Sequence, residues 1–215
     1  MTDTAPEPDR VEGAPHPRET RQIFGQDQAI AEFQEARAAG RLHSGWLLTG
    51  PRGIGKATLA WKLAAMLLAG DRAPASGNPT DIALPPNHPD MRLILAGAHP
   101  RLAVIRRPLN EKTGKLRDEI TVDAVRGLKS FFRMSASDGG HRVVIVDAAD
   151  EMNRNAAIAI LKELEEPPAR STLMLIAHQP ARLLPTIRSR CRVLRCHPLA
   201  HDDFVAAISQ AGHAA

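Results

Sequence analysis

The feature that most constrains the fold is a glycine-rich segment between an apolar run and a helical pattern. WLLTG at residues 46–50 is a short apolar run that ends in glycine, which is typical of a buried parallel strand. PRGIG follows, and residues 56–69 then carry an apolar stripe at helical spacing, with a glycine directly after it. The stripe consists of Leu59, Leu63, Met66 and Leu67. A strand, a glycine loop and a helix therefore follow in the order that a phosphate-binding loop requires.

The loop matches the consensus G-x-x-x-x-G-K-[ST] except at its last position. Gly50, Gly55 and Lys56 fit, whereas Ala57 stands where the consensus has a hydroxyl. Glycines let backbone N–H groups point at a phosphate, the following helix adds its positive N-terminus, and the lysine can reach the β- and γ-phosphates. Alanine lacks the hydroxyl that normally binds Mg²⁺. Thr58 lies about 100° further around the helix, so we expect its hydroxyl to face the α-phosphate side. The alternative is a glycine-rich turn that binds no ligand.

A second stretch, VVIVD at residues 143–147, is the strongest strand pattern in the chain. An apolar strand that ends in aspartate is where phosphate-loop proteins hold the magnesium ion, so Asp147 is a candidate ligand. Taken alone, it could equally be a turn residue at a strand end. Hydrolysing proteins of this class usually carry a glutamate next, which orients the attacking water, but here that residue is Ala148. Asp150 and Glu151 lie further along and are expected to point elsewhere.

Ala57 and Ala148 occupy the two positions that handle metal and water in such a site. Loss of one well-placed catalytic group commonly costs roughly 10²–10⁴ in rate. Two losses in one site therefore predict negligible turnover. Our hypothesis is that the chain binds ATP or ADP weakly or not at all, and does not hydrolyse it.

Strand and helix patterns alternate along the rest of the chain. Helices are expected at 27–39, 122–134, 153–166 and from 199 onwards. In the helix 122–134 the residues expected to face inward are Val122, Val125, Leu128 and Phe132, with Phe131 as a further candidate. In the helix 153–166 they are Ala157, Ile158, Leu161 and Leu164. Further strands are expected at 91–95, 102–107, 172–177 and 192–196, with 102–107 at a sheet edge. Residues 71–90 and 108–118 are expected to be loops. The alternation predicts an α/β fold with a doubly wound parallel sheet.

The first 22 residues are expected to form a disordered tail, because they are rich in proline and poor in large apolar side chains. Residues 1–20 carry five acidic residues and two arginines, a net charge of −3, so residues 21–215 carry +7 of the total of +4. A basic body favours an anionic partner such as nucleic acid or nucleotide. The chain has only two cysteines, which fits a reducing compartment. It has no apolar run of the ~18 residues that a membrane span needs, and its N-terminus is unlike a signal peptide. We therefore expect a cytoplasmic protein without membrane contact.

TIRSRC at residues 186–191 brings several arginines together after the expected strand 172–177. These arginines are Arg188, Arg190 and, one residue further on, Arg192. An arginine held on a turn can reach a neighbour's γ-phosphate and stabilise its transition state. A surface ion pair is the commoner role for any single arginine.

Two cysteines and two histidines near residue 200 superficially resemble zinc ligands. They are Cys191, Cys196, His197 and His201, with the spacing C-x4-C-H-x3-H. Structural zinc sites usually pair cysteines at C-x₂₋₄-C and place the histidines well apart from them. We therefore expect no metal here and interpret Cys191 as a buried thiol.

Three stretches together resemble the delta-prime subunits of bacterial DNA polymerase III clamp loaders. They are RLHSGWLLTGPRGIGKATLA, RVVIVDAADEMNRNAAIAILKELEEPP and LLPTIRSRC, of which LKELEEPP (161–168) and SRC (189–191) are the most specific. The resemblance spans roughly Ile23 to the end of the chain. It implies a P-loop AAA+ fold with a five-stranded parallel sheet, a small helical lid and a collar domain. This chain would then hold a tail at 1–22, the AAA+ domain at 23–198 and the start of the lid at 199–215, without the collar domain.

The resemblance also implies a function. In the family, five related subunits form an open ring that binds ATP, opens the sliding clamp and releases it around primed DNA. The delta-prime subunit has a degenerate site and lends its SRC arginine, here Arg190, to the ATP of a neighbouring ATPase subunit. The nucleotide-site residues implied by the match are Gly50, Pro51, Gly53, Gly55, Lys56, Ala57, Thr58 and Asp147. Expected partners are the gamma/tau-type and delta-type subunits, the sliding clamp and primer–template DNA.

Three features of the family are absent from this chain or cannot be assigned to particular residues in it: the zinc ligands, the polar sensor and the DNA contacts. Many relatives bind zinc through four cysteines in the stretch matching 71–100, where this chain has none, so no zinc is expected. ATP-using relatives carry a polar sensor residue where this chain has Ala177-His178-Gln179. DNA contacts are hard to place. The candidates are basic residues that could equally form solvated faces, namely Arg126, Lys129, Arg133 and Arg154.

Two other functions stay open. One is an active AAA+ ATPase, such as the ATP-using clamp-loader subunit or a helicase loader, against which Ala57 and Ala148 argue. The other is an unrelated P-loop enzyme such as a small-molecule kinase, for which Asp150 is the only obvious acid or base.

Overall fold

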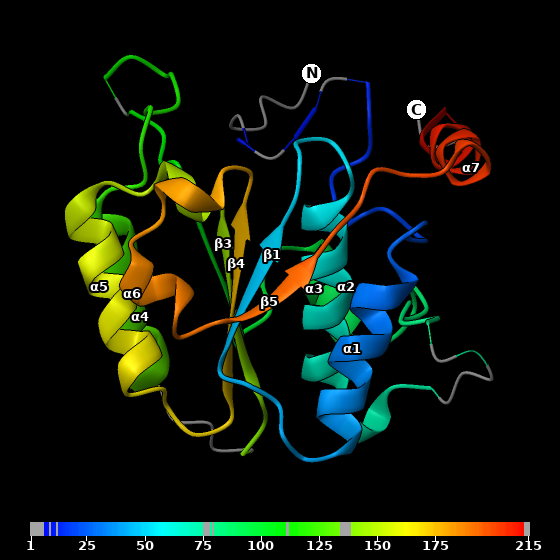
Figure 1. The fold of residues 1–215 in the computed structure, drawn as a ribbon, viewed down its shortest axis with the longest axis horizontal. Helices are drawn as coiled ribbons and strands as arrows, with labels where there is room; N and C mark the ends of the chain where they lie inside the picture. The colour runs from blue at the N-terminus through cyan, green and yellow to red at the C-terminus, as the bar shows by residue number, and fades with distance from the viewer. Residues whose placement is uncertain are drawn as a thin grey trace.

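The structure, a computed structural model, describes residues 7–8, 10–11, 13–74, 78, 80–110, 112–133 and 139–212. Its centre is a parallel five-stranded sheet with the strand order β2-β3-β4-β1-β5 (Figure 1). The strands are β1 (Gly45–Thr49), β2 (Leu102–Arg106), β3 (Arg142–Asp147), β4 (Ser171–Ala177) and β5 (Arg192–Arg195). The predicted parallel sheet is confirmed, and β2 is an edge strand as expected.

Helices cover both faces of the sheet, so the fold is doubly wound (Figure 1). The helices on one face are α1 (Asp27–Ala38), α2 (Lys56–Ala69) and α3 (Pro89–Leu95). Those on the other are α4 (Val122–Arg133), α5 (Arg154–Glu165) and α6 (Pro185–Arg188). Short 3₁₀ turns are η1 (Gly70–Arg72), η2 (Ala149–Glu151) and η3 (Pro180–Arg182). The last helix, α7 (His201–Gly212), stands apart from both layers. Within the described ranges, none of the helices has the length and apolar character needed to cross a membrane.

The central strands are buried on both faces, which explains their continuous apolar sequences. Along β1, Trp46 and Leu48 pack in the core beneath α1 and α2, while Leu47 packs in the core beneath α5. Successive side chains of a strand point to opposite faces, so each strand contributes to both cores. The parallel direction brings the carboxyl ends of all strands to one edge of the sheet, where the phosphate loop follows β1.

The strand predicted at 91–95 is wrong, because these residues belong to α3. The ring of His88 accepts a hydrogen bond from the backbone of the second helical residue, and a proline occupies the first position. Met91 and Ile94, three residues apart, are buried, whereas Leu93 is 41% exposed. A five-residue apolar run has too few positions to separate a strand from a helix. The cap and the packing against α2 decide the outcome.

The predicted helices 122–134 and 153–166 are α4 and α5, but part of their inward faces was misjudged. In α4, Val125 and Leu128 are buried; Met134 lies outside the described residues. In α5, Ile158 was expected to face inward and is 43% exposed. The buried side of α5 consists of Ala156, Ala157, Ile160 and Leu164. The helix starts at the Asn153 cap, whose side chain accepts from the Ala156 N–H at 3.0 Å, and its small Ala156 and Ala157 pack in the core with Ile160.

The N-terminal segment differs from the disordered tail expected for residues 1–22. Its described residues are 7–8, 10–11 and 13–22, and they run across the edge of the sheet where the strands end (Figure 1). The side chain of His16 is 0% exposed and meets the ring of Trp61 on α2 edge-on, with ring centroids 5.7 Å apart. The prediction of disorder therefore does not hold for this part of the segment.

Candidate functional site

The phosphate loop turns tightly between β1 and α2 because of its glycines. Gly50, Gly53 and Gly55 have φ angles of 143°, 80° and 91°, which glycine adopts without strain. A Cβ atom at Gly50 would also lie only 2.5 Å from the carbonyl oxygen of Cys196. The glycine at position 50 therefore allows the loop to approach the end of β5.

Lys56 begins α2 and is only 3% exposed. Its ammonium group donates hydrogen bonds to the carbonyl oxygens of Gly50, at 2.7 Å, and Pro51. Burial lowers the pKa of Lys56, and electrostatic interactions with Cys196 and Asp147 offset part of that effect. Lys56 thus bridges two carbonyl groups of the loop and interacts electrostatically with Asp147.

A cavity of about 500 Å³ opens beside this loop. That volume is in the range of small-molecule and cofactor sites. Among the residues that line it are Gly53, Gly55, Lys56, Ala57, Thr58 and Asp147. The structure therefore brings most of the predicted nucleotide-site residues together. The other two, Gly50 and Pro51, contribute the carbonyl groups that hold the lysine.

The two alanines that the sequence singled out face the same cavity. Ala57 lies in the first turn of α2 and Ala148 directly follows β3, next to Asp147. Both present only a methyl group. Position 57 therefore offers no hydroxyl to a metal ion, and position 148 offers no carboxylate to a water molecule.

Asp150 does not belong to the residues that line the cavity, in agreement with the sequence interpretation. It is 7% exposed, and its two carboxylate oxygens accept hydrogen bonds from the backbone N–H groups of His178, at 3.1 Å, and Gln179, at 2.9 Å. These contacts fix the segment that follows β4 against the turn that follows β3. Asp150 is therefore a structural residue, which removes the acid or base that a kinase function required.

The expectation that Glu151 points elsewhere is wrong, because Glu151 lines the cavity. One carboxylate oxygen lies 2.7 Å from the guanidinium of Arg52 in the phosphate loop, and the other lies 3.0 Å from Arg107, after β2. Glu151 therefore ties the phosphate loop to the opposite side of the cavity. Its partners Arg52 and Arg107 are 99 and 44 residues away in sequence, so no local sequence pattern predicts these two ion pairs.

His178, which follows β4, also lines the cavity. Burial and the charge of Lys56 lower the pKa of His178. The imidazole is therefore neutral at neutral pH, with one nitrogen able to donate and the other able to accept. Its buried Nδ1 has no hydrogen-bond partner in the described part of the chain.

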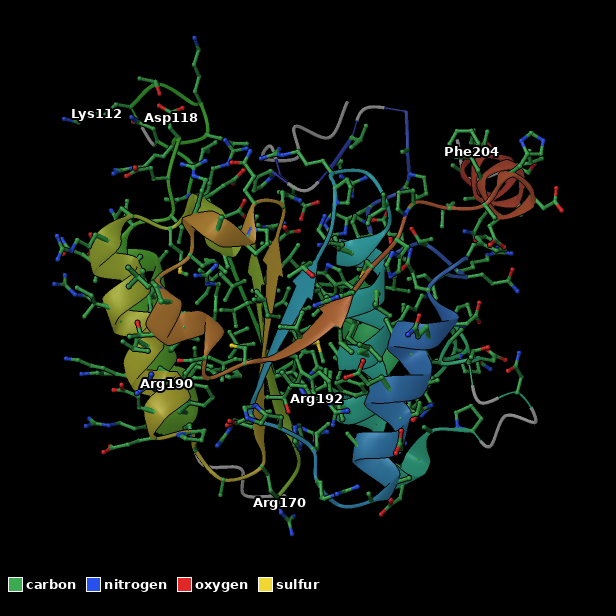
Figure 2. The ribbon with its side chains drawn as sticks, in the orientation of Figure 1. Lys112, Asp118, Arg170, Arg190, Arg192 and Phe204 are labelled. Carbon is green, nitrogen blue, oxygen red and sulfur yellow. The ribbon has the colours of Figure 1, made fainter. Side chains whose placement is uncertain are left out.

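Arg190 lies on the turn after α6, away from the cavity (Figure 2). Its guanidinium donates to the carbonyl oxygen of Thr186 at 3.1 Å and lies 3.0 Å from the carboxylate of Glu165 at the end of α5. The neighbouring Arg192 points the other way, pairing with Glu32 on α1 at 2.9 Å and lying over the ring of Trp46. The arginines therefore serve different surfaces, and Arg190 cannot act on the cavity of its own chain from this position.

The cysteines considered as zinc ligands are separate thiols. Burial raises the pKa of Cys191 to about 12 and that of Cys196 to about 11. Cys191 packs close to Gly45, whereas Cys196 lies beside the phosphate loop. In the part of the chain that the structure describes, no three His, Cys, Asp or Glu side chains gather as a metal site would require.

The candidate DNA-contacting residues are all exposed. They are Arg126, Lys129 and Arg133 on α4 and Arg154 at the start of α5. Arg126 pairs with Asp123 at 2.6 Å, both side chains being largely in solvent. The two helices that carry these cations pack side by side (Figure 1).

Comparison with known proteins identifies the relatives of this chain. The family model described as DNA polymerase III, delta subunit, matches residues 25–200. The DNA polymerase III subunit delta' of Pseudomonas aeruginosa is 44% identical over 151 residues, which cover 70% of this chain and 42% of that protein. The chain thus spans less than half the length of this relative.

Solved structures support the fold. A DNA polymerase III gamma subunit-related protein of Thermotoga maritima matches with a TM-score of 0.50 and 19% identity, covering 86% of this chain and 57% of that one. The RuvB Holliday junction branch migration motor of Thermotoga maritima matches with a TM-score of 0.52 and 15% identity, covering 87% of this chain and 50% of that one. These likenesses identify the P-loop AAA+ fold. With the family match over residues 25–200, the resemblance to delta-prime subunits is confirmed: the chain belongs to the DNA polymerase III delta-subunit family.

Proposed function

We propose that this chain is the AAA+ domain of a delta-prime-type clamp-loader subunit that does not hydrolyse ATP itself. In the assembled loader it would help to place the sliding clamp on primed DNA and supply Arg190 to the ATP of a neighbouring ATPase subunit. The observation that carries the proposal is the cavity wall, where Ala57 and Ala148 stand at the metal and water positions.

The cavity suits the phosphates of a nucleotide better than it suits catalysis. The backbone N–H groups of the glycine loop, the N-terminus of α2 and Lys56 would hold the phosphates of ATP or ADP. Asp147 is the one predicted magnesium ligand with an oxygen at the site. Without a hydroxyl at position 57 and a carboxylate at position 148, metal binding and water activation both lose a group. The expected behaviour is weak nucleotide binding with negligible turnover.

The surroundings of Arg190 support a role in a neighbour's site. Its side chain is 38% exposed and is held by a carboxylate that is itself 43% exposed. It lies away from the cavity of its own chain, as a residue that acts on another subunit must. A guanidinium is always charged and can bind phosphate oxygens bidentately, which suits transition-state stabilisation in a partner's site.

The partners follow from the same assignment. We place the chain beside gamma/tau-type and delta-type subunits, with the clamp and primer–template DNA bound by the assembled ring in the cytoplasm. The cations on α4 and α5 are the candidate DNA contacts. In this scheme the AAA+ domain spans 23–198, and α7, with Phe204, Val205 and Ile208 exposed, begins the helical lid at 199–215 (Figure 2).

A reconstituted loader that contains this subunit tests the proposal. ATP hydrolysis by the ring is compared for the native subunit, Arg190→Ala and Lys56→Ala. We expect Arg190→Ala to reduce hydrolysis by the neighbour and Lys56→Ala to leave it unchanged. Phosphate release by the isolated chain above the level of Lys56→Ala would instead identify an active AAA+ ATPase.

A further inference from the structure

The cavity beside the phosphate loop has a wall that the family match does not include. That match begins at residue 25, yet residues of the preceding segment line the same cavity as the phosphate loop. They are Pro8, Val11, Ala14, Pro15, Pro17, Thr20 and Gln22. We call the described residues of 7–22 the N-terminal cover.

The cover is anchored on α2 by a buried aromatic contact. His16 is fully buried and its ring meets Trp61 edge-on, at an interplanar angle of 78°. Around His16 the chain forms a compact turn: the N–H of Glu19 donates to the carbonyl oxygen of His16 at 2.8 Å, and the N–H of Arg18 donates to its Nδ1 at 3.1 Å. A side chain held in this way is typical of a packed element rather than of a mobile tail.

A second anchor lies at the edge of the sheet, on β2. The carboxylate of Glu7 lies 2.9 Å from the guanidinium of Arg106 at the end of β2, and 2.9 Å from that of Arg18 within the cover. The Glu7 side chain is only 12% exposed. Although burial raises its pKa, the hydrogen bond from Arg106 and the charge of Arg18 leave the pKa of Glu7 below its ordinary value. The carboxylate is therefore ionised at neutral pH, so both ion pairs are formed.

A third anchor joins the cover to the last helix. The N–H of Gln22 donates to the side-chain oxygen of Gln210 at 2.7 Å, and the side-chain amide of Gln210 donates to the carbonyl oxygen of Gln22 at 3.1 Å. Ala207, Gln210 and Ala211 of α7 line the same cavity. The cover and α7 therefore line the phosphate-loop cavity together. The cover contacts α2, β2 and α7.

We propose that the N-terminal cover closes the phosphate-loop cavity to nucleotide-sized ligands and that its release controls how fast such a ligand enters and leaves. The cover is held at Trp61 on α2 and at Arg106 at the end of β2. Between these contacts its described residues run along the edge of the sheet where the parallel strands end, which is the side from which a nucleotide would reach the loop (Figure 1). The identity of the ligand rests on the proposed nucleotide site. The closing of the cavity by the cover does not depend on that proposal.

The test uses a thiol placed inside the cavity of the full chain. Ala57→Cys puts a reactive group on the cavity wall, while the native cysteines react slowly because burial raises their pKa values to about 12 and about 11. The reaction rate at pH 7.5 is measured with a bulky reagent, fluorescein maleimide, and a small one, iodoacetamide. The background is the chain without the Ala57→Cys change.

Glu7→Gln and His16→Ala are each combined with Ala57→Cys to weaken the cover. We expect the bulky reagent to react about tenfold faster in both, which corresponds to about 1.4 kcal/mol of lost closing free energy, while the small reagent changes less than twofold. The matched control is Glu32→Gln, which removes an ion pair with Arg192 that does not line the cavity and should leave both rates unchanged.

Two outcomes would overturn the proposal. One is an unchanged rate for the bulky reagent in Glu7→Gln and His16→Ala. The other is an equal rise for both reagents, since that would show general loosening of the fold instead of a cover. Because maleimide labelling needs no nucleotide, a chain that binds no ATP or ADP would refute the proposed nucleotide site and leave this test intact. Where a fluorescent ADP does bind, its dissociation should accelerate in Glu7→Gln and not in Glu32→Gln.

Discussion

Arg190 and Glu165 form an ion pair of 3.0 Å that joins the turn after α6 to the end of α5. Glu165 belongs to the LEEPP stretch and Arg190 to the SRC stretch, so the two most specific parts of the family resemblance meet in space. Exposed ion pairs contribute only about 0–1 kcal/mol. The contact therefore orients the arginine and is weak enough to break, as the proposed role of Arg190 in a neighbour's site requires.

The first prediction concerns Arg190 itself. In a reconstituted loader, Arg190→Ala should reduce single-turnover ATP hydrolysis at the neighbouring site by roughly 10³-fold, the lower range for an arginine supplied in trans. Arg190→Lys should recover little of it, because an ammonium lacks the planar fork of the guanidinium. Arg192→Ala is the matched control, since Arg192 pairs with Glu32. Equal rates for Arg190→Ala and Arg192→Ala would contradict the assignment.

The second prediction concerns the ion pair. Glu165→Gln should change the free energy of unfolding by less than about 1 kcal/mol, because both side chains are substantially in solvent. Urea denaturation measures this directly, with the adjacent exposed residue changed as Glu166→Gln for comparison. A large loss of stability would show that the pair holds the fold together and that Arg190 is not available to a partner.

The third prediction addresses the missing hydroxyl. Ala57→Thr places a hydroxyl on the cavity wall beside Lys56, so nucleotide binding should become dependent on Mg²⁺. We expect Mg²⁺ to tighten binding about tenfold, or about 1.4 kcal/mol, in this variant and to have little effect in the native chain. Isothermal titration with ADP at matched ionic strength measures the difference. An equal Mg²⁺ dependence in both proteins would mean that position 57 does not limit metal binding.

The fourth prediction follows from Asp150. Its carboxylate accepts two backbone hydrogen bonds and is 7% exposed, so Asp150→Ala leaves two donors without their acceptor. An unsatisfied buried group costs about 1–3 kcal/mol, and a loss of this size should appear in urea denaturation at pH 7.5. Asp123→Ala removes an exposed carboxylate and serves as the control, with a change expected below about 0.5 kcal/mol.

The fifth prediction is a pH dependence of stability. Burial, with the charges of Arg101, Arg170 and Arg37, lowers the pKa of His141 to about 4 from its ordinary value of 6.5. Because the unfolded chain then binds a proton more readily than the folded one, this contribution to stability is fully present above pH 6.5 and is lost as the pH falls towards 4. The loss should reach at most roughly 3 kcal/mol.

The measurement for His141 is denaturation at several pH values. His141→Gln keeps a group that can bind the hydroxyl of Thr172, which lies 2.9 Å from the imidazole, and should flatten the pH dependence. His201→Gln, at an exposed position of α7, should not flatten it. Identical slopes in the native chain and His141→Gln would show that other groups control acid stability.

The sequence predicted the structure best where the spacing of neighbouring residues determines it. Glycines at 50, 53 and 55 have the positive φ angles that the loop pattern demands. The apolar run of β1 is followed by this glycine loop, and that of β3 consists of β-branched residues, and both features favour a strand. The residues that follow these elements, Lys56 and Asp147, meet at one cavity because parallel strands end at the same edge.

Sequence reasoning failed where the structure depends on contacts between residues far apart in the sequence. The run at 91–95 became a helix through its cap and its packing against α2. The ion pairs of Glu151 connect segments that nothing in the sequence links. The composition of the N-terminal segment predicted disorder, yet a few anchors, chiefly Glu7 and His16, suffice to hold it on the domain.

The measurement that most directly tests a retained cavity without catalysis is titration of the chain with fluorescent ATP and ADP, with and without Mg²⁺, while phosphate release is followed. We predict weak binding that depends on Lys56 and hardly on Mg²⁺, with no phosphate release above that of Lys56→Ala. Steady phosphate release by the native chain, abolished in Lys56→Ala, would contradict the central claim and identify this protein as an active ATPase.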